Sequence, residues 1–108
     1  MDKKVVTEIV EFKFSPEIAD EECVRIINTL EEKFHSQQKG FLDTELVKGK
    51  DNHWVMIQHW ASMEDTKAVV KLMMKEPATE EFRKAIDPTS VKMQLLEQVK
   101  IWNKVRLL

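Results

Sequence analysis

Residues 40–65 read GFLDTELVKGKDNHWVMIQHWASMED, and this stretch decides the fold. Two runs within it, 41–48 and 53–61, are rich in β-branched and aromatic residues, which is typical of strands. The residues between them, 49–52, include the Gly, Asp and Asn that favour a hairpin turn. Ser62, with an acidic residue three positions later, resembles a capping box and predicts a helix directly after the second strand. The stretch therefore predicts a strand, a hairpin, a second strand and a helix.

The part of the chain before this stretch predicts one more strand and one more helix. Residues 5–14 (VVTEIVEFKF) contain neither Gly nor Pro and are typical of a strand. The helix that follows has two alternative start signals, Ser15-Pro16 and Asp20, and Gly40 is its expected C-terminal glycine.

The part after the stretch completes the expected topology. Pro77 is expected to interrupt the second helix, and Thr79 can cap its continuation. Residues 87–90 (DPTS) predict a loop, and residues 91–102 predict a fourth strand. The order β-α-β-β-α-β predicts an α+β, ferredoxin-like fold, with a four-stranded antiparallel sheet and both helices on one face. We expect a single domain over residues 1–108.

Composition and charge exclude several classes of partner. The chain has 108 residues, with 17 basic and 19 acidic side chains and a formal net charge of −2. No basic stripe stands out, so neither nucleic acid nor a membrane surface is expected as a partner. No apolar run approaches the roughly 20 residues that span a bilayer. The single Cys23 cannot form an internal disulfide, which favours a reducing compartment, and we expect the protein to be cytoplasmic.

Both faces of the predicted sheet are apolar, which predicts a second copy of the chain. In the strand 53–61, Trp54 and Met56 point to one face, and Val55 and Ile57 point to the other. Two helices cover only one face, and monomers rarely expose an apolar patch larger than a few hundred Å². We therefore expect a homodimer packed sheet to sheet. The alternative is a monomer whose C-terminal tail folds over the open face.

Two carboxylates fall inside otherwise apolar strands. Glu8 and Glu97 are expected to be costly there unless they are paired or protonated. They are therefore the best candidates for an acid or base with a perturbed pKa. If either lies at a sheet end, it is instead an ordinary solvated residue.

The histidines do not predict a metal site. His53 and His59 share one strand face, but six residues at about 3.3 Å each separate them by roughly 20 Å. His59 is expected to be either a hydrogen-bonded structural residue or a proton carrier. His35 is expected near the polar end of the first helix, where an imidazolium interacts favourably with the helix dipole.

One face of the strand 53–61 predicts a ligand pocket. If this face meets the helices, Trp54, Met56, Gln58 and Trp60 edge the cleft between the sheet and the helices. Trp60 can then form the wall of a pocket for a flat apolar ligand, and Gln58 supplies a polar group there. Met73 of the second helix can shape the same cavity. The alternative is that all of these are ordinary core residues.

The sequence resembles the antibiotic biosynthesis monooxygenase superfamily of dimeric α/β barrels. Residues 54–65 (WVMIQHWASMED) carry the sharpest similarity: a strand that ends in Trp, then a small residue, Ser and acidic residues at a helix start. Residues 76–83 (EPATEEFR) resemble a stretch in the family's second helix. The resemblance implies two sheets that close across a dimer, with a ligand pocket between helices and sheet in each subunit.

The resemblance also implies two chemistries. Some members oxidise aromatic polyketides or quinols with O₂ and no cofactor, and others degrade haem with an Asn, a Trp and a His. Trp60 matches the family's Trp. Residues 5–14 contain no Asn, Ile86 stands roughly where haem-binding members carry the His, and Met56 stands where some quinone-forming members place an Asn. Haem is therefore disfavoured, and we expect no cofactor and no metal.

These observations lead to one hypothesis and its alternatives. The leading hypothesis is a cofactor-independent monooxygenase that acts on a small aromatic or quinol-type substrate. Its expected catalytic residues are Trp60, Gln58 and the base candidate Glu8; Trp54, Met56 and Met73, together with Trp60, are expected to bind the substrate. The alternatives are a non-catalytic dimeric barrel that binds a small apolar metabolite, for example in a stress response, and a barrel that serves only for assembly.

Overall fold

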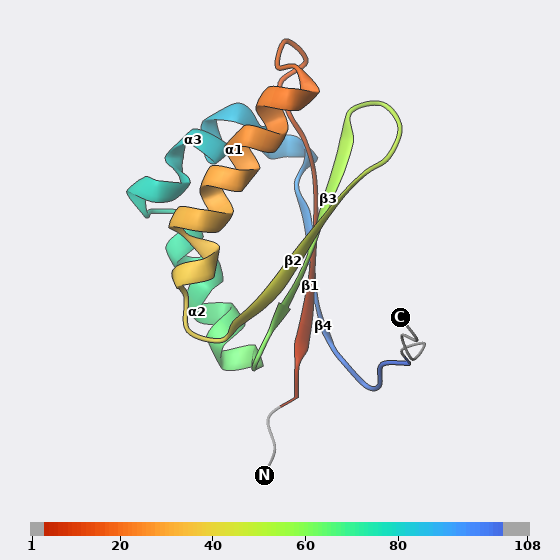
Figure 1. The fold of residues 1–108 in the computed structure, drawn as a ribbon, viewed down its shortest axis with the longest axis vertical. Coiled ribbons are helices and arrows are strands. Elements are labelled where there is room, and N and C mark those ends of the chain that lie inside the picture. The colour runs from red at the N-terminus through yellow and green to blue at the C-terminus, as the bar shows by residue number, and fades with distance from the viewer. Residues whose placement is uncertain (1–3, 103–108) are drawn as a thin grey trace, which may run out of the picture.

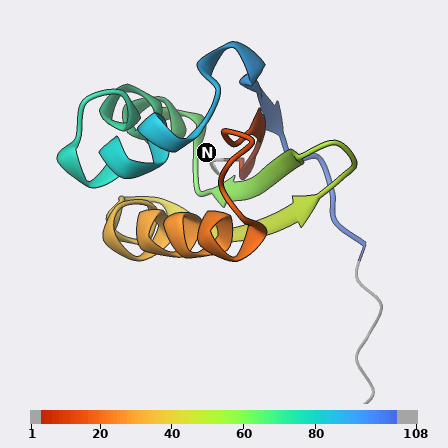
Figure 2. The same cartoon turned by 90° about the horizontal axis from the view of Figure 1, so that it is seen from above.

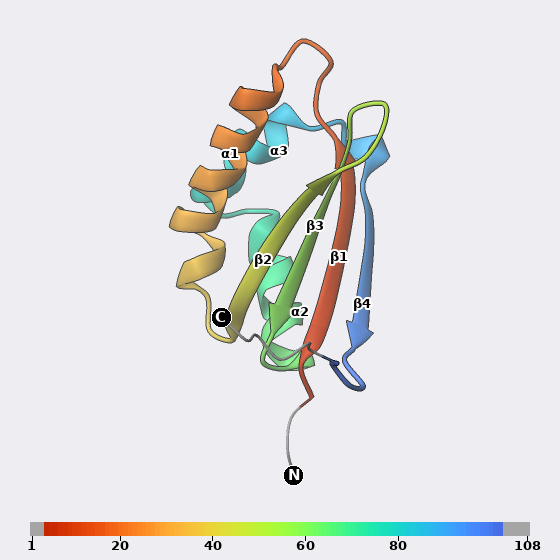
Figure 3. The ribbon, with the colours of Figure 1, turned by 45° about the vertical axis from the view of Figure 1, so that its right-hand side comes forward.

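The computed structural model describes residues 4–102 and has the predicted α+β, ferredoxin-like architecture. Its four antiparallel strands lie in the order β2-β3-β1-β4, and the helices cover one face of the sheet (Figures 1 and 3). Along the chain the elements are β1 (Val6–Lys13), α1 (Asp20–Lys33), β2 (Phe41–Lys48), β3 (His53–Trp60), α2 (Met63–Met73), α3 (Glu80–Ala85) and β4 (Lys92–Glu97). Short 3-10 helices are formed by His35–Gln37, Pro77–Thr79 and Pro88–Ser90.

The core lies between the helices and one face of the sheet. Viewed from above, α1 lies beside the α2–α3 segment on the same side of the strands (Figure 2). The apolar stripe of α1 is buried as its spacing predicts, at Cys23, Ile26, Ile27 and Leu30. Aromatic rings join the layers: the ring of Phe12 meets that of Phe82 edge to face at 5.2 Å, and Phe14 meets Trp54 at 5.8 Å.

The alternation of β3 confirms which face meets the helices. Trp54, Met56, Gln58 and Trp60 are buried, whereas the residues between them are only partly buried. The face with Trp60 is therefore the helix side, as the pocket hypothesis requires. The opposite face, here called the outer face, is defined by Ile9, Val47, Val55, Ile57 and Leu96. No helix within residues 4–102 covers the outer face, and Val47 and Leu96 are 37% and 44% exposed.

The first helix begins later than Ser15-Pro16 predicts. It starts at Asp20 with Ala19 as the N-cap, so Asp20 is the first helical residue rather than the cap. The reason is tertiary: the Ser15 N–H donates to the Ala85 carbonyl at 2.8 Å, and Phe14 pairs with Ile86. These bonds hold the chain extended past the end of β1.

Gly40 does not end α1 directly, because the helix ends at Lys33 and a 3-10 turn follows. Gly40 instead adopts a φ of +87° before β2, and a Cβ atom there would lie 2.5 Å from Oδ2 of Asp65. A glycine is required by this close approach to α2 as well as by the backbone angle.

The fourth strand is shorter than the predicted range 91–102. It ends at Glu97, because β1 begins at Val6 and offers no further partner after the bond from the Gln98 N–H to the Val5 carbonyl. Val99, Ile101 and Trp102 therefore lie outside the sheet and are exposed. The rest of the tail, which the monomer alternative requires, lies outside the described residues.

Two other local signals have different outcomes. Ser62 is confirmed as the N-cap of α2, since its Oγ accepts a hydrogen bond from the Asp65 N–H at 3.1 Å. Pro77 interrupts the second helix as expected. Thr79 is not a side-chain cap: its hydroxyl faces the carbonyls of Met73 and Glu76, each at 2.8 Å, because the chain folds back on the end of α2.

Within residues 4–102, no helix combines the length and the apolar character needed to cross a membrane. The cytoplasmic location stays a prediction.

Candidate functional site

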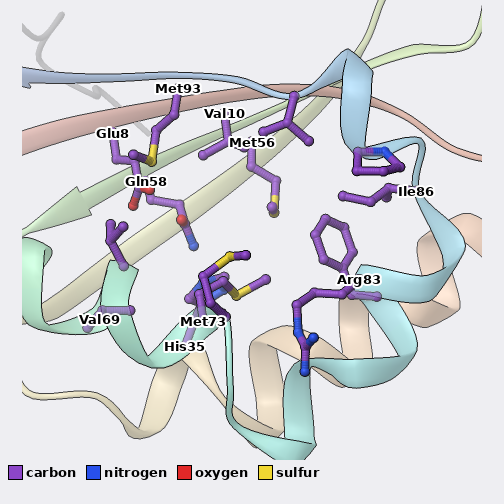
Figure 4. A pocket seen from close by; sticks show the side chains of 15 residues that line it. Glu8, Val10, His35, Met56, Gln58, Val69, Met73, Arg83, Ile86 and Met93 are labelled. Atoms are coloured by element: carbon purple, nitrogen blue, oxygen red, sulfur yellow. The ribbon is translucent and has the colours of Figure 1, made fainter.

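A cavity of about 430 Å³ opens between the helix side of the sheet and the α2–α3 segment (Figure 4). This volume falls within the roughly 300–1,000 Å³ of typical small-molecule sites. Most of the lining is apolar. The sheet contributes Glu8, Val10, Met56, Gln58 and Met93, the helices contribute Val69, Val70, Met73, Phe82 and Arg83, and His35 lines the cavity from the turn after α1.

Three of the polar groups, Glu8, Gln58 and His35, line one part of the cavity, and Arg83 lies apart from them on the α3 side (Figure 4). The antiparallel register places Glu8 of β1 directly opposite Gln58 of β3, and the alternation of both strands turns these side chains toward the helices. His35 reaches the same cavity from the short 3-10 helix that follows α1. Glu8, Gln58 and His35 are here called the polar wall; they are 6%, 1% and 4% exposed.

Glu8 accepts its hydrogen bond from behind the cavity. The indole Nε1–H of Trp60 donates to its Oε1 at 2.9 Å, and both side chains are buried. Burial raises the pKa of Glu8 above its ordinary value of 4.5, partly opposed by the Trp60 hydrogen bond and by the nearby His35. The protonated carboxyl therefore persists to higher pH than in water, and the expectation of a perturbed carboxyl at Glu8 is met.

The other two members of the polar wall are joined through Glu31 of α1. Gln58 donates from Nε2 to Oγ1 of Thr44 at 3.0 Å, and more weakly to Oε1 of Glu31 at 3.4 Å. The second carboxylate oxygen of Glu31 contacts Nδ1 of His35. Glu31 lies in the last turn of α1, and His35 lies four residues later, in the 3-10 helix that follows.

The predicted site residues separate into two groups. Glu8, Gln58, Met56 and Met73 all line the cavity, whereas Trp60 does not. Trp60 is fully buried behind the polar wall, where its ring meets those of His35 at 6.0 Å and Phe41 at 5.6 Å. The expectation that Trp60 forms the pocket wall is therefore corrected: it contacts two lining residues, through its bond to Glu8 and its ring packing against His35.

Trp54 lies farther from the cavity. It is absent from the lining; its indole N–H donates to Oδ1 of Asn52 at 3.1 Å, and its ring packs against Phe14. From β3, the cavity is lined by Met56 and Gln58 in the middle of the strand, whereas Trp54 lies next to the hairpin. The structure thus favours a core role for Trp54 over substrate contact.

Two polar lining residues, His35 and Arg83, were not predicted from the sequence. His35 was expected near the polar end of a helix, but it is buried and packs against the rings of Phe34 and Trp60. The available signal was the i, i+4 spacing from Glu31. Arg83 also lines the cavity, and its Nε–H donates to Oγ1 of Thr79 at 2.9 Å.

The remaining ionisable candidates lie away from the cavity. Glu97 is exposed at the end of β4, which is the solvated alternative. His59 pairs with Asp43 at 2.7 Å and His53 with Glu11 at 3.0 Å, all on the side of the sheet away from the helices. Within residues 4–102, no three His, Cys, Asp or Glu side chains are grouped so that they could hold a metal ion.

Comparison with known proteins identifies the family. The model of the antibiotic biosynthesis monooxygenase family matches residues 5–87, so the chain belongs to this family. The comparison with curated proteins returned no match.

Solved structures share the fold at low sequence identity. The chain is similar to SnoaB from Streptomyces nogalater, described as a cofactor-independent oxygenase, with a TM-score of 0.71, 18% identity and coverage of 94% of this chain and 99% of that one. It is similar to a conserved protein from Methanosarcina mazei, with a TM-score of 0.67, 11% identity and coverage of 89% and 94%. It is also similar to a dimeric ferredoxin-like protein from an uncultured marine organism, with a TM-score of 0.65, 13% identity and coverage of 96% of each chain.

Proposed function

We propose that this protein is a cofactor-independent monooxygenase that acts on a small hydroxyaromatic or quinol-type substrate. The observation that carries the proposal is the cavity itself: a largely apolar space of about 430 Å³ lined by the polar wall and by Arg83. Such a site buries a flat ring system and fixes its orientation through a few polar contacts. Family membership and the likeness to an oxygenase described as cofactor-independent support the proposal.

The substrate supplies all the electrons in this reaction. For a quinol, one atom of O₂ enters at a ring carbon, the other leaves as water, and the quinol becomes a hydroxyquinone. O₂ takes up four electrons, two from conversion of the quinol to the quinone and two from hydroxylation of the ring. The protein then has to bind the substrate, orient it and manage protons.

The polar wall suits these tasks. Gln58 can orient a substrate oxygen because its amide both donates and accepts hydrogen bonds. Glu8, which burial keeps protonated to higher pH, is better suited to donate a hydrogen bond to that oxygen than to act as the base. Met56 and Met73 give the apolar part of the cavity an adaptable shape.

The protein is proposed to act as a homodimer through the outer face. Ile9, Val55 and Ile57 form the apolar centre of that face, and they are only partly buried in the single chain. A second sheet would cover them. The dimeric ferredoxin-like protein to which the chain is similar gives the assembly support.

Oxygen uptake with a panel of quinols and hydroxyaromatic compounds tests the proposed activity. Val70 lines the cavity, so Val70→Phe should fill it and reduce uptake at least tenfold. Val24 is 48% exposed on α1 and outside the lining, so Val24→Phe is the matched control and should behave as the wild type. The proposal fails if no compound is consumed, or if the two variants are equally active.

A second candidate, a non-catalytic dimeric barrel that binds a small apolar metabolite, is favoured by one observation. Trp60, which matches the family's Trp, does not reach the cavity, and most of the lining is apolar. Native mass spectrometry of freshly purified protein discriminates between the two functions. A retained small molecule without oxygen uptake supports the binder.

A further inference from the structure

His35 is a buried histidine whose side chain also lines the cavity. It lies in the turn after α1, 4% exposed, with its ring 5.1 Å from that of Phe34 and 6.0 Å from that of Trp60. Both aromatic rings pack against the imidazole, and His35 also lines the cavity.

The carboxylate of Glu31 fixes the tautomer of His35. One of its oxygens contacts Nδ1 of His35, and the other accepts from Nε2 of Gln58 at 3.4 Å. A carboxylate accepts and does not donate, so Nδ1 carries the proton and Nε2 of the neutral ring carries the lone pair.

Nε2 of His35 is not sealed in the core. Among residues 4–102, Nε2 takes part in no hydrogen bond. Every fully buried side-chain nitrogen or oxygen in the same range has a hydrogen-bond partner, so Nε2 is not fully buried. The space that His35 lines is the cavity.

We propose that His35 is the catalytic base of this site, that it removes the proton of a substrate hydroxyl, and that Glu31 is its positioning residue. The inference rests on the proposed function, because the substrate is the hydroxyaromatic compound proposed above. In the step, the substrate O–H bond breaks, its electron pair stays on the oxygen, and the proton binds Nε2. No electron leaves the substrate in this step, and the electron-rich anion it produces is the species that reacts with O₂.

Several charged groups act on this proton transfer. Glu31 faces the ring and stabilises the imidazolium, and Arg83 of α3 lines the same cavity and favours a substrate anion. Glu8 of β1 also lines the cavity, and burial raises its pKa. In its neutral form Glu8 does not repel the substrate anion, whereas its ionised form does. The groups presented by β2 and β3, Thr44 and Gln58, do not titrate.

The test uses alizarin, a dihydroxyanthraquinone whose absorption moves to longer wavelength when a hydroxyl ionises. The dye is titrated into the full-length protein under nitrogen, so no oxidation is needed for the readout. In the wild type, we expect bound alizarin to ionise at lower pH than free alizarin. In His35→Gln, we expect it to bind with a Kd within about threefold of the wild type but with the spectrum of the neutral dye.

Matched variants separate catalysis from folding. His53→Gln makes the same change at a partly exposed histidine outside the cavity and should keep the wild-type spectrum. Glu31→Gln should lower the ionised fraction of the bound dye, Glu31→Asp should restore part of it, and Glu32→Gln, at an exposed neighbour, should change nothing. In oxygen uptake, His35→Gln should lower kcat/KM by about 10²–10⁴-fold, the range of general-base catalysis.

The outcomes distinguish the two proposals. If the wild type consumes a substrate but His35→Gln and His53→Gln are equally active, or ionise the dye equally, His35 is not the base and the proposed function still stands. If the wild type neither binds the dye nor consumes any substrate, the proposed function fails and the role of His35 fails with it. Circular dichroism of each variant shows whether it is folded, and Glu31→Gln provides a readout if His35→Gln is not.

Discussion

The bond between Trp60 and Glu8 makes a quantitative prediction, because it joins a buried indole to a buried carboxyl across 2.9 Å. Trp60→Phe removes the donor and leaves Glu8 without its partner. A hydrogen bond to an ionised group contributes about 1.5–3 kcal/mol, and one to a neutral group contributes about 0.5–1.5 kcal/mol. The energy that couples the two side chains should therefore rise as Glu8 ionises.

The sign of the pH dependence follows from the raised pKa of Glu8. In the folded state the carboxyl keeps its proton above 4.5, its ordinary pKa, while the unfolded chain releases it. The contribution of Glu8 to stability is therefore largest below that value and declines as pH rises through the folded-state pKa. Trp60→Phe removes an interaction that lowers this pKa, so the decline should be larger in the variant than in the wild type.

A double-mutant cycle measures the coupling energy between Trp60 and Glu8. The loss of packing caused by the smaller phenylalanine ring occurs in both Trp60→Phe variants of the cycle and cancels. Urea unfolding of the wild type, Trp60→Phe, Glu8→Leu and the double variant gives the coupling energy. We expect about 0.5–1.5 kcal/mol at about pH 4 and about 1.5–3 kcal/mol at about pH 9, where a larger part of Glu8 is ionised.

Trp54 provides the control for this cycle. It is also buried, but its indole N–H donates to the uncharged Asn52. The effect of Trp54→Phe on the free energy of unfolding should change little between the two pH values. A Trp60–Glu8 coupling below about 0.5 kcal/mol at both pH values, or one that falls as pH rises, refutes the reasoning.

Three further predictions concern the fold and the assembly. Gly40→Ala should lower the free energy of unfolding by about 2–4 kcal/mol, because the positive φ costs about 1–2 kcal/mol and the new Cβ displaces Asp65; a loss below about 1 kcal/mol in urea unfolding would contradict it. Ser62→Ala should cost about 1 kcal/mol by the same measurement, since the N-cap bond of α2 is lost, and an unchanged midpoint would show that the cap is not needed. Ile57→Glu, in the centre of the outer face, should give a monomeric mass by light scattering with an unchanged circular dichroism spectrum, whereas a dimeric mass would show that the copies meet elsewhere.

The local signals of the sequence predicted the fold well. The ranges 41–48 and 53–61 agree closely with β2 and β3, and Ser62 caps α2, because strand alternation and a helix N-cap depend on residues near in sequence. The end of β4 and the start of α1 could not be predicted in this way. Both depend on which distant backbone is available for pairing, namely Val5 for the first and Ala85 for the second.

Only the site residues that lie on strands could be predicted, because strand alternation depends on residues near in sequence. Glu8 and Gln58 follow from strand alternation alone, since each is a polar residue at an inward position. His35 does not follow, because its burial depends on how the turn after α1 packs against Trp60 and the strands. In the sequence, the i, i+4 spacing of Glu31 and His35 is equally typical of a solvated pair on a helix surface.

The position of Trp60 gives it a different role from the one that the family resemblance implies. A tryptophan that lines a cavity acts on the ligand through its ring, whereas Trp60 lies behind the polar wall and acts through the protonation of Glu8. Its effect on the cavity is then electrostatic: the indole N–H stabilises the carboxylate, burial stabilises the acid, and the balance sets the charge next to the ligand. With His35 held by Glu31 on the helix side, an acid from the sheet and a base from the helices face the same space. The acid Glu8 and the base His35 each have a partner of their own: Trp60 donates a hydrogen bond to Glu8, and the carboxylate of Glu31 contacts Nδ1 of His35.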